Sequence, residues 1–243
     1  MFGLIVSDPA CDTARREALS RLLHDYDLPL TGFTDAPAPR FRKDMSRAAF
    51  LRTASAALLI PGEALPMDAL LTHLPGGDPL PANVLRRHLL LQLSLLPYLR
   101  PGRPVTQLDG CFLLGEDLLI APVSPEDTVD VQLPPGVWTE LNGTCRTGRL
   151  RCMRGYNETP VLVRENALLP ISVNGQSLTE LHADDADRLT LHWFQPADQA
   201  RCMLADGTWY QVQRRDSQSS VQTNTDRGFH LIVHENGTER LIR

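Results

Sequence analysis

Lysine is almost absent from this chain of 243 residues, because Lys43 is the single lysine among 24 basic residues. The arginines are scattered along the chain, and the formal net charge is -5. Proteins that bind nucleic acid or an anionic membrane usually present a clustered basic patch. The charge pattern therefore predicts that neither nucleic acid nor a membrane surface is a partner.

Paired cysteines and long apolar runs are missing as well. The five cysteines are an odd number, and none forms a C-x-x-C pair. Such usage argues against a disulfide framework and a zinc site, and it is typical of a reducing compartment. No apolar run approaches the ~18 residues that a membrane-spanning helix needs. Residues 1–6 lack the basic start and long apolar core of a signal peptide, so we expect a cytoplasmic protein.

Common catalytic and metal-binding motifs are also absent. The chain has no G-x-S-x-G, no H-E-x-x-H, no P-loop and no G-x-G-x-x-G after a strand. The seven histidines lack ligand spacing, and we expect His230 and His234, four apart in a predicted strand, to be surface residues. The acidic stretch 182–187 lacks the glycine and terminal glutamate of an EF-hand loop. We therefore expect no metal and no cofactor.

The apolar pattern changes in character near residue 100. Residues 1–100 alternate short apolar strands with helical patterns, which predicts βα units and a parallel sheet. The expected strands are 2–6 and 28–30, the expected helices are 13–25 (capped by Asp12 or Thr13), 45–59 and 82–99, and 61–81 is expected to be loop. After Pro101 short apolar runs alternate with turns, which is typical of all-β domains. The expected strands there include 129–133, 160–164, 189–193, 209–214 and 229–234.

Three tryptophans fall in the β-rich part of the chain, namely Trp138, Trp193 and Trp209. Flat aromatic faces suit sugar rings, so together they could form a stacking platform. The alternative is core packing, which the distribution of one tryptophan per strand or turn region favours.

Residues 112–123, Phe-Leu-Leu-Gly-Glu-Asp-Leu-Leu-Ile-Ala-Pro-Val, predict a tight turn at 115–117 that leads into a buried strand. Further motifs follow in order at 133–138, 142–143, 159–164 and 167–171. Their order and spacing resemble the region where the barrel of family-31 glycoside hydrolases, the α-glucosidase and α-xylosidase group, passes into its C-terminal β-domains. Residues 84–99 look like the last barrel helix of that family, and 205–210 are similar to a turn of its distal β-domain.

The resemblance implies an α/β plus all-β fold, in which a partial (β/α)8 barrel remnant is followed by two β-sandwich domains. The remnant would occupy residues 1–104. It would be only part of a barrel, because a closed barrel needs eight strands and typically ~250 residues. The proximal β-sandwich domain would cover 105–174 and the distal one 175–243.

Two carboxylates carry over from the family's active site. Residues 4–9, Leu-Ile-Val-Ser-Asp-Pro, stand where the family has W-S/T-G-D-N, so Asp8 maps onto its general acid/base. The Trp and Gly of that motif are replaced, and the alternative is an ordinary Asp in a βα turn that helps to cap the next helix. Residues 28–35 resemble G-x-P-F-W-G-x-D-I-G-G, which gives Asp35 as a substrate-binding residue. One residue is inserted and the glycine pair is absent, so Asp35 could also be only a turn residue.

A third residue and one absence complete the comparison with the family's site. Residues 50–61 are similar to the R-W-x-Q-x-x-A-F-x-P helix, which gives Arg52 as a substrate-binding residue, but the R-x-H that normally follows is missing. The nucleophile motif W-x-D-M-N-E is also missing from the sequence. Retaining glycosidases need two carboxyl groups ~5–5.5 Å apart, so Asp8 alone would supply half of the machinery.

By resemblance, the activity is hydrolysis of O-glycosyl bonds of α-linked sugars in an oligosaccharide or glycoside, with an incomplete active site in this chain. The alternative is a catalytically inactive remnant or pseudoenzyme that acts as a carbohydrate-binding or interaction module. Open edges of a short parallel sheet recruit other strands. We therefore also expect self-association, or a partner chain, through residues 1–60.

Overall fold

A computed structural model describes residues 4–10, 12–60, 63–75, 78–95, 104–108, 111–121, 128–141, 143–153, 160–171, 189–204, 206–215 and 218–242. Internal contacts divide the chain into two compact units. The first contains residues 1–92, 122–129 and 152–159, and the second contains 93–121, 130–151 and 160–243. Each unit is described by itself.

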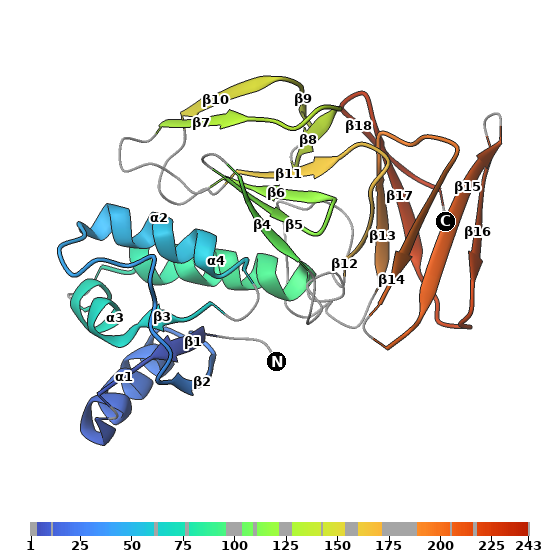
Figure 1. Cartoon of the computed structure of the whole chain (residues 1–243). Coiled ribbons are helices and arrows are strands. Elements are labelled where there is room, and N and C mark those ends of the chain that lie inside the picture. The colour runs from blue at the N-terminus through green and yellow to red at the C-terminus, as the bar shows by residue number, and fades with distance from the viewer. Residues whose placement is uncertain are drawn as a thin grey trace. The chain divides into compact units, whose positions relative to one another are not determined.

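The first unit alternates strands and helices along the chain (Figure 1). Its elements are β1 (Leu4–Ser7), α1 (Thr13–Asp25), β2 (Leu30–Thr34), α2 (Arg47–Ala57), β3 (Leu65–Pro66), α3 (Met67–His73) and α4 (Leu80–Leu95), whose last three residues fall in the second unit. The strand order is β2-β1-β3, and both pairs are parallel. The predicted βα pattern and parallel sheet are therefore confirmed.

Helix α1 begins where the sequence predicts it. The Asp12 carboxylate accepts a hydrogen bond of 3.0 Å from the backbone N–H of Arg15, which satisfies one of the free donors of the first turn. Leu19 and Leu23 are four residues apart, and both are buried in a core that also contains Leu4 and Val6 of β1. Burial of this apolar face on the sheet stabilises the helix, because a 13-residue helix is marginal alone in water.

The predicted loop at 61–81 is wrong in part, because β3 and α3 lie within it. Met67, Leu70 and Leu74 are buried at spacings of three and four residues, which is the period of one helix face. Pro66 at the cap and Pro75 beyond the end delimit the helix and concealed its short apolar pattern. The predicted strand 28–30 is displaced as well, since β2 runs from Leu30 to Thr34.

The second unit is built from strands. They are β4 (Val105–Leu108), β5 (Cys111–Leu114), β6 (Leu118–Ile120), β7 (Thr128–Gln132), β8 (Trp138–Glu140), β9 (Cys145–Arg146), β10 (Arg149–Met153), β11 (Val161–Arg164), β12 (Leu168–Ile171), β13 (Thr190–Phe194), β14 (Gln199–Met203), β15 (Trp209–Arg215), β16 (Gln218–Thr223), β17 (His230–Glu235) and β18 (Thr238–Leu241). Two residues each of β7 and β10 fall in the first unit. The described part of the chain after residue 100 is thus mostly β, as predicted.

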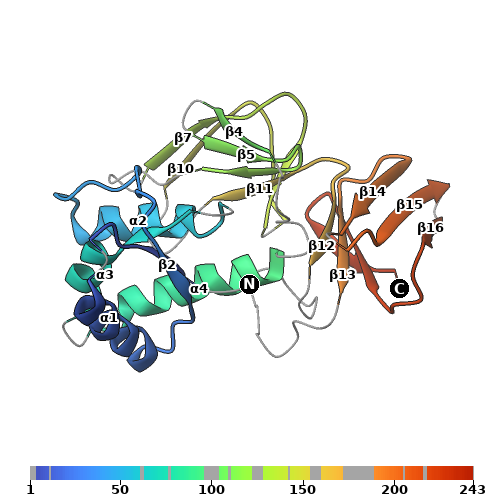
Figure 2. The ribbon, with the colours of Figure 1, turned by 60° about the horizontal axis from the view of Figure 1, so that its bottom comes forward.

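Four sheets are formed by these strands (Figure 2). One has six strands in the order β4-β5-β6-β11-β8-β9, and β10 pairs with β7. A four-stranded sheet follows with the order β12-β13-β17-β18, and a three-stranded sheet has the order β14-β15-β16. The predicted division at residues 105 and 175, and the barrel origin of residues 1–104, stay predictions.

Residues 112–120 form the tight turn and the buried strand that the sequence predicts, as a hairpin. Strands β5 and β6 pair antiparallel with Phe112 opposite Ile120, and the turn between them places Gly115 at a φ of 61°. That left-handed conformation is accessible to glycine at little cost. Strand β6 is fully buried and lies inside its sheet, with β5 and β11 as its two neighbours.

The second core lies between β12, β13 and β17 on one side and β14 and β15 on the other. Trp193 and Tyr210 are its largest side chains, and neither is exposed. Trp138 is also fully buried, whereas Trp209 is partly exposed beneath the guanidinium of Arg201. Core packing is therefore confirmed for two of the three tryptophans.

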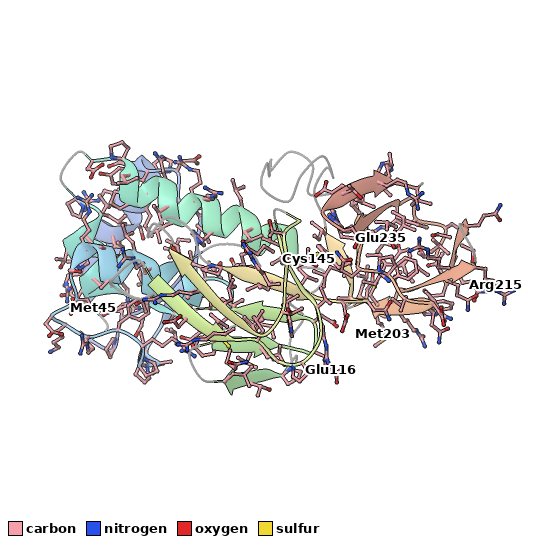
Figure 3. All side chains as sticks on the ribbon, turned by 90° about the horizontal axis from the view of Figure 1, so that it is seen from above. Met45, Glu116, Cys145, Met203, Arg215 and Glu235 are labelled. Carbon is pink, nitrogen blue, oxygen red and sulfur yellow. The ribbon has the colours of Figure 1, made fainter. Side chains whose placement is uncertain are left out.

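Two turns join the six-stranded and four-stranded sheets within the second unit. An added Cβ on Gly143, before β9, would lie 3.8 Å from Gly237, in the β17–β18 turn. The Gln195 amide lies 3.0 Å from the sulfur of Cys145, and its oxygen accepts a hydrogen bond of 3.3 Å from the Asn236 N–H. In Figure 3 the labels Cys145 and Glu235 locate these two turns, since Glu235 is the residue before Asn236.

Candidate functional site

The carboxyl edge of the first unit's parallel sheet carries two of the three predicted site residues. Strand β1 ends at Ser7 and β2 ends at Thr34, and these two residues are opposite each other in the parallel register. Asp8 and Asp35 directly follow, so both lie at the same edge of adjacent strands. The Asp8 N–H donates a hydrogen bond of 2.7 Å to the carbonyl of Thr34, which fixes the start of the turn.

Asp8 is held by the helix that follows it. Its side chain is 1% exposed, and its Oδ2 accepts a hydrogen bond of 2.6 Å from the Nε of Arg16 on α1. The Arg16 guanidinium also lies 5.0 Å from the centroid of the Phe33 ring on β2, a cation–π contact. The carboxylate is therefore anchored by α1 and β2 rather than presented freely to solvent.

This geometry bears on the predicted role of Asp8. A general acid must hold a proton and place it on the leaving oxygen of the substrate. The guanidinium of Arg16 donates a charge-assisted hydrogen bond to one carboxylate oxygen and so occupies it. Acid catalysis by Asp8 would require Arg16 to move or the other oxygen to carry the proton. The family role of Asp8 stays a prediction.

Asp35 and Arg52 occupy contrasting environments. Asp35 is exposed beside Asp8 at the sheet edge, where its carboxylate can accept hydrogen bonds from hydroxyl groups of a ligand. Arg52 lies on α2 among buried residues and is only 2% exposed. A sugar could reach its guanidinium only after α2 or its neighbours moved. Substrate binding by either residue stays a prediction.

Arg16 is the site residue that the sequence analysis missed. It lies eight residues after Asp8, across a turn and the first turn of α1, and no motif or period marks such a pair. Only the topology indicates this pair, because in a strand–turn–helix unit the first turn of the helix lies near the carboxyl end of the strand. Among the described residues, no group of three or more His, Cys, Asp or Glu is placed to hold a metal ion.

A second polar cluster lies in the second unit, where His192 and His234 are buried side by side. The expectation that His234 is a surface residue is therefore wrong, although His230 is exposed as predicted. Strands β13 and β17 pair in parallel, which brings together two histidines 42 residues apart. No local pattern could have found this pair. The acidic stretch 182–187 lies outside the described residues.

No helix in the described part of the chain is long and apolar enough to cross a membrane.

Comparisons with known proteins agree with the sequence motifs. Residues 96–169 match the family model described as the glycosyl hydrolase family 31 C-terminal domain. No curated protein matches the chain.

Several solved structures share the fold. The chain is similar to the cycloalternan-forming enzyme from Listeria monocytogenes, in complex with a pentasaccharide substrate, at 19% identity and a TM-score of 0.65, covering 79% of this chain and 23% of that one. For the Flavobacterium johnsoniae GH31 dextranase complexed with glucose, the identity is 19% and the TM-score 0.60, with 77% and 30% covered. For the GH31 α-xylosidase from Xanthomonas citri they are 15% and 0.56, with 98% and 33% covered.

Identities this low show a shared fold alone, and the chain spans only about a quarter to a third of the length of these structures. The matched segment 96–169 includes the buried hairpin and the strands that follow it. The resemblance predicted from the sequence is thus confirmed: this chain resembles the C-terminal portion of glycoside hydrolase family 31 enzymes, and residues 96–169 match the model of that family's C-terminal domain.

Proposed function

We propose that this chain is a family-31-like glycoside hydrolase portion that serves the hydrolysis of α-linked sugars, with an active site that is incomplete within the chain. The family match at 96–169 supports this proposal, as do structural neighbours that bind sugars by their descriptions. In this proposal residues 1–104 are part of a (β/α)8 barrel, whose sites lie at the carboxyl ends of its strands.

The position of Asp8 carries the proposal. It directly follows a parallel strand, at the edge where such barrels build their active sites, and its side chain is held in one orientation by Arg16. Asp35 follows the neighbouring strand. A sugar bound at this edge would meet one fixed and one exposed carboxylate, while the attacking carboxylate would come from outside these residues.

A second candidate function is a non-catalytic carbohydrate-binding or interaction module. The ion pair favours it, because Arg16 occupies an oxygen that a general acid would offer to its substrate. A carboxylate anchored in this way can still accept hydrogen bonds from sugar hydroxyls through its other oxygen.

Turnover of aryl α-glycosides by the purified chain discriminates these candidates. We expect no turnover by the chain alone, because the sequence offers no partner carboxylate in a matching motif. Glycoside turnover that is lost in Asp8→Asn but kept in Asp44→Asn, an exposed aspartate on a loop, would overturn the incomplete-site proposal. Oligosaccharide binding without turnover, weakened by Asp8→Asn or Asp35→Asn, would support the binding module.

The proposed partner of residues 1–60 would complete the parallel sheet. Among the described residues, β2 and β3 each pair with β1 alone, so each has one edge without a neighbouring strand. Unpaired strand edges are the usual places where another strand adds. We propose a second copy, or another chain, at these edges. The proposed cytoplasmic location rests on the cysteine usage.

A further inference from the structure

The buried histidine pair of the second unit has a geometry that no catalytic or sugar-binding role requires. His192 lies on β13 and His234 on β17, and their Nδ1 and Nε2 atoms are 2.7 Å apart. They are 1% and 2% exposed. They alternate along their strands with Trp193 and Val233, which pack into the core on the opposite face of the sheet.

Aromatic contacts seal the pair from water. The Phe194 ring stacks on the His234 ring with centroids 4.2 Å apart and planes 2° apart. The two imidazoles are themselves stacked, with centroids 5.0 Å apart. Burial in this setting disfavours charge on either ring. It lowers the pKa of His192 to about 3 and that of His234 to about 4.

Two of the four ring nitrogens of the pair have no hydrogen-bond partner among the described residues. They are Nε2 of His192 and Nδ1 of His234. The second of these lies 3.3 Å from Oε1 of Glu239 on β18. A lone pair there would face a carboxylate, so this nitrogen carries the N–H. Nε2 of His234 must then accept from Nδ1 of His192, which leaves a lone pair at the buried Nε2 of His192.

Among the described residues, no hydrogen-bond acceptor is within reach of an added proton at that nitrogen. Among the described residues of β13, β17 and β18 on this face of the sheet, the charged or titratable neighbours are Glu239 on β18, which reaches His234, and the exposed His230 on β17. The residue opposite His192 on β12 is Leu169. On β13 and β17 the other residues that share the face are Thr190, Phe194 and Ile232. Burial raises the pKa of Glu239, so its negative charge weakens in the same acidic range.

We infer that His192 and His234 form an acid-released latch, which at neutral pH ties the β17–β18 hairpin to β13 and in acid lets the hairpin separate. Protonation of both rings turns their shared contact into two opposed donors, so the hydrogen bond between them cannot persist. Water reaches the buried Nε2 of His192 only when the hairpin moves. This inference stands on the second unit alone and does not require glycosidase activity.

The hairpin that the latch controls is also part of the junction between the two larger sheets. Its turn carries Gly237, beside Gly143, and Asn236, which donates to Gln195. The backbone N–H of Gln195 in turn donates to the carbonyl of His234, 2.8 Å away. Opening at His234 therefore loosens the junction along with the edge of the sheet.

The pH range follows from proton linkage. Histidines in the opened hairpin take up protons near pH 6.5, whereas the latched pair resists protonation until about pH 4 or below. The latch is therefore at full strength above pH 6.5 and weakens as the pH falls toward 4, by about tenfold per pH unit for each histidine.

Hydrogen exchange on the full chain tests this inference. After correction for intrinsic exchange rates, protection of amides in β17 and β18 should fall at least about tenfold between about pH 7 and about pH 5. The double variant His192→Phe/His234→Phe keeps aromatic bulk and removes both protons, and we expect it to lose this fall. His230→Gln, an exposed histidine on the same strand, should behave as the unchanged chain does.

Three outcomes would overturn the latch: protection in the hairpin independent of pH, an equal fall in the double variant, or a simultaneous loss across β12 to β18. If the double variant does not fold, ring-proton titration of the unchanged chain decides. Two histidines that titrate together far below pH 6.5 support the latch, and independent titration of His192 and His234 near pH 6.5 overturns it.

Discussion

The indole Nε1 of Trp193 donates a hydrogen bond of 3.0 Å to the side-chain oxygen of Asn166. The same oxygen accepts from the N–H of Ala197, and the Asn166 amide donates to the carbonyl of Gln199. Asn166 has a φ of 60°, a conformation that asparagine tolerates better than most residues. One side chain in the β11–β12 turn therefore satisfies three groups, one on β13, one on β14 and one in the segment between them.

Replacing this asparagine should destabilise the second unit. Asn166→Ala leaves the indole N–H without its partner, and we expect a loss of about 2–3 kcal/mol in the free energy of unfolding. Asn166→Asp keeps the acceptor and should cost less. Denaturant unfolding followed by tryptophan fluorescence measures the change, since all three tryptophans lie in the second unit. Asn83→Ala on α4, an exposed control, should leave this transition where it is.

Local signals in the sequence predicted the elements whose partners are close in the chain. The hairpin at 112–120 and the cap of α1 by Asp12 each depend on residues a few positions apart, so turn chemistry and apolar period were sufficient. Helix α3 was missed because flanking prolines suggested a loop.

The candidate site was less predictable than the elements. Asp8 could be placed after a strand from its motif, whereas Asp35 was assigned by resemblance alone because the strand before it was expected at 28–30; the structure has both at one edge of the sheet. The partner Arg16 and the pair formed by His192 and His234 depend on which strands and helices become neighbours. That choice is made by the packing of whole elements, and no spacing in the sequence records it.

The ion pair between Asp8 and Arg16 should be a main support of the first unit. Arg16→Gln leaves a carboxylate that is 1% exposed without its counter-charge, and we expect a loss of about 3 kcal/mol in the free energy of unfolding. The far-ultraviolet helix signal reports this unit, because every described helix begins in it. Arg21→Gln, on the exposed side of α1, is the matched control. Equal stability of the two variants would contradict a structural role for the pair.

The β17–β18 turn requires glycine at its second position. Gly237 has a φ of 76°, so Gly237→Ala forces a side chain into the left-handed region at a cost of about 1–2 kcal/mol. Gly228 has open space around its Cβ position and a φ outside the positive range, so Gly228→Ala should be neutral or slightly stabilising. Thermal unfolding of the two variants measures the difference. A Gly237→Ala protein as stable as Gly228→Ala would show that the turn adapts freely.

Acid should weaken the first unit through His88. This residue of α4 is buried, its Nδ1 lies 2.8 Å from the carbonyl of Val84, and burial lowers its pKa to about 4. The unfolded chain takes up this proton near pH 6.5, so stability is complete above that value and falls as the pH drops toward 4, by up to about 3 kcal/mol. Denaturant melts of the helix signal at several pH values measure the slope. The exposed control His24→Gln should keep that slope, and a slope unchanged in His88→Gln would assign it to other groups.

Association through the first unit can be tested at one position on the edge strand β2. A Cβ added at Gly32 meets nothing within 4 Å, so Gly32→Lys places a charge on this strand without a clash. Charged residues on an edge strand oppose the addition of another strand. We expect light scattering of the unchanged chain to show growth in mass with concentration, and Gly32→Lys to reduce it. The control Gly228→Lys has equally open space, lies in the second unit and should associate as the unchanged chain does. A chain that stays monomeric at high concentration, or one that both lysines affect equally, would show that residues 1–60 need no partner.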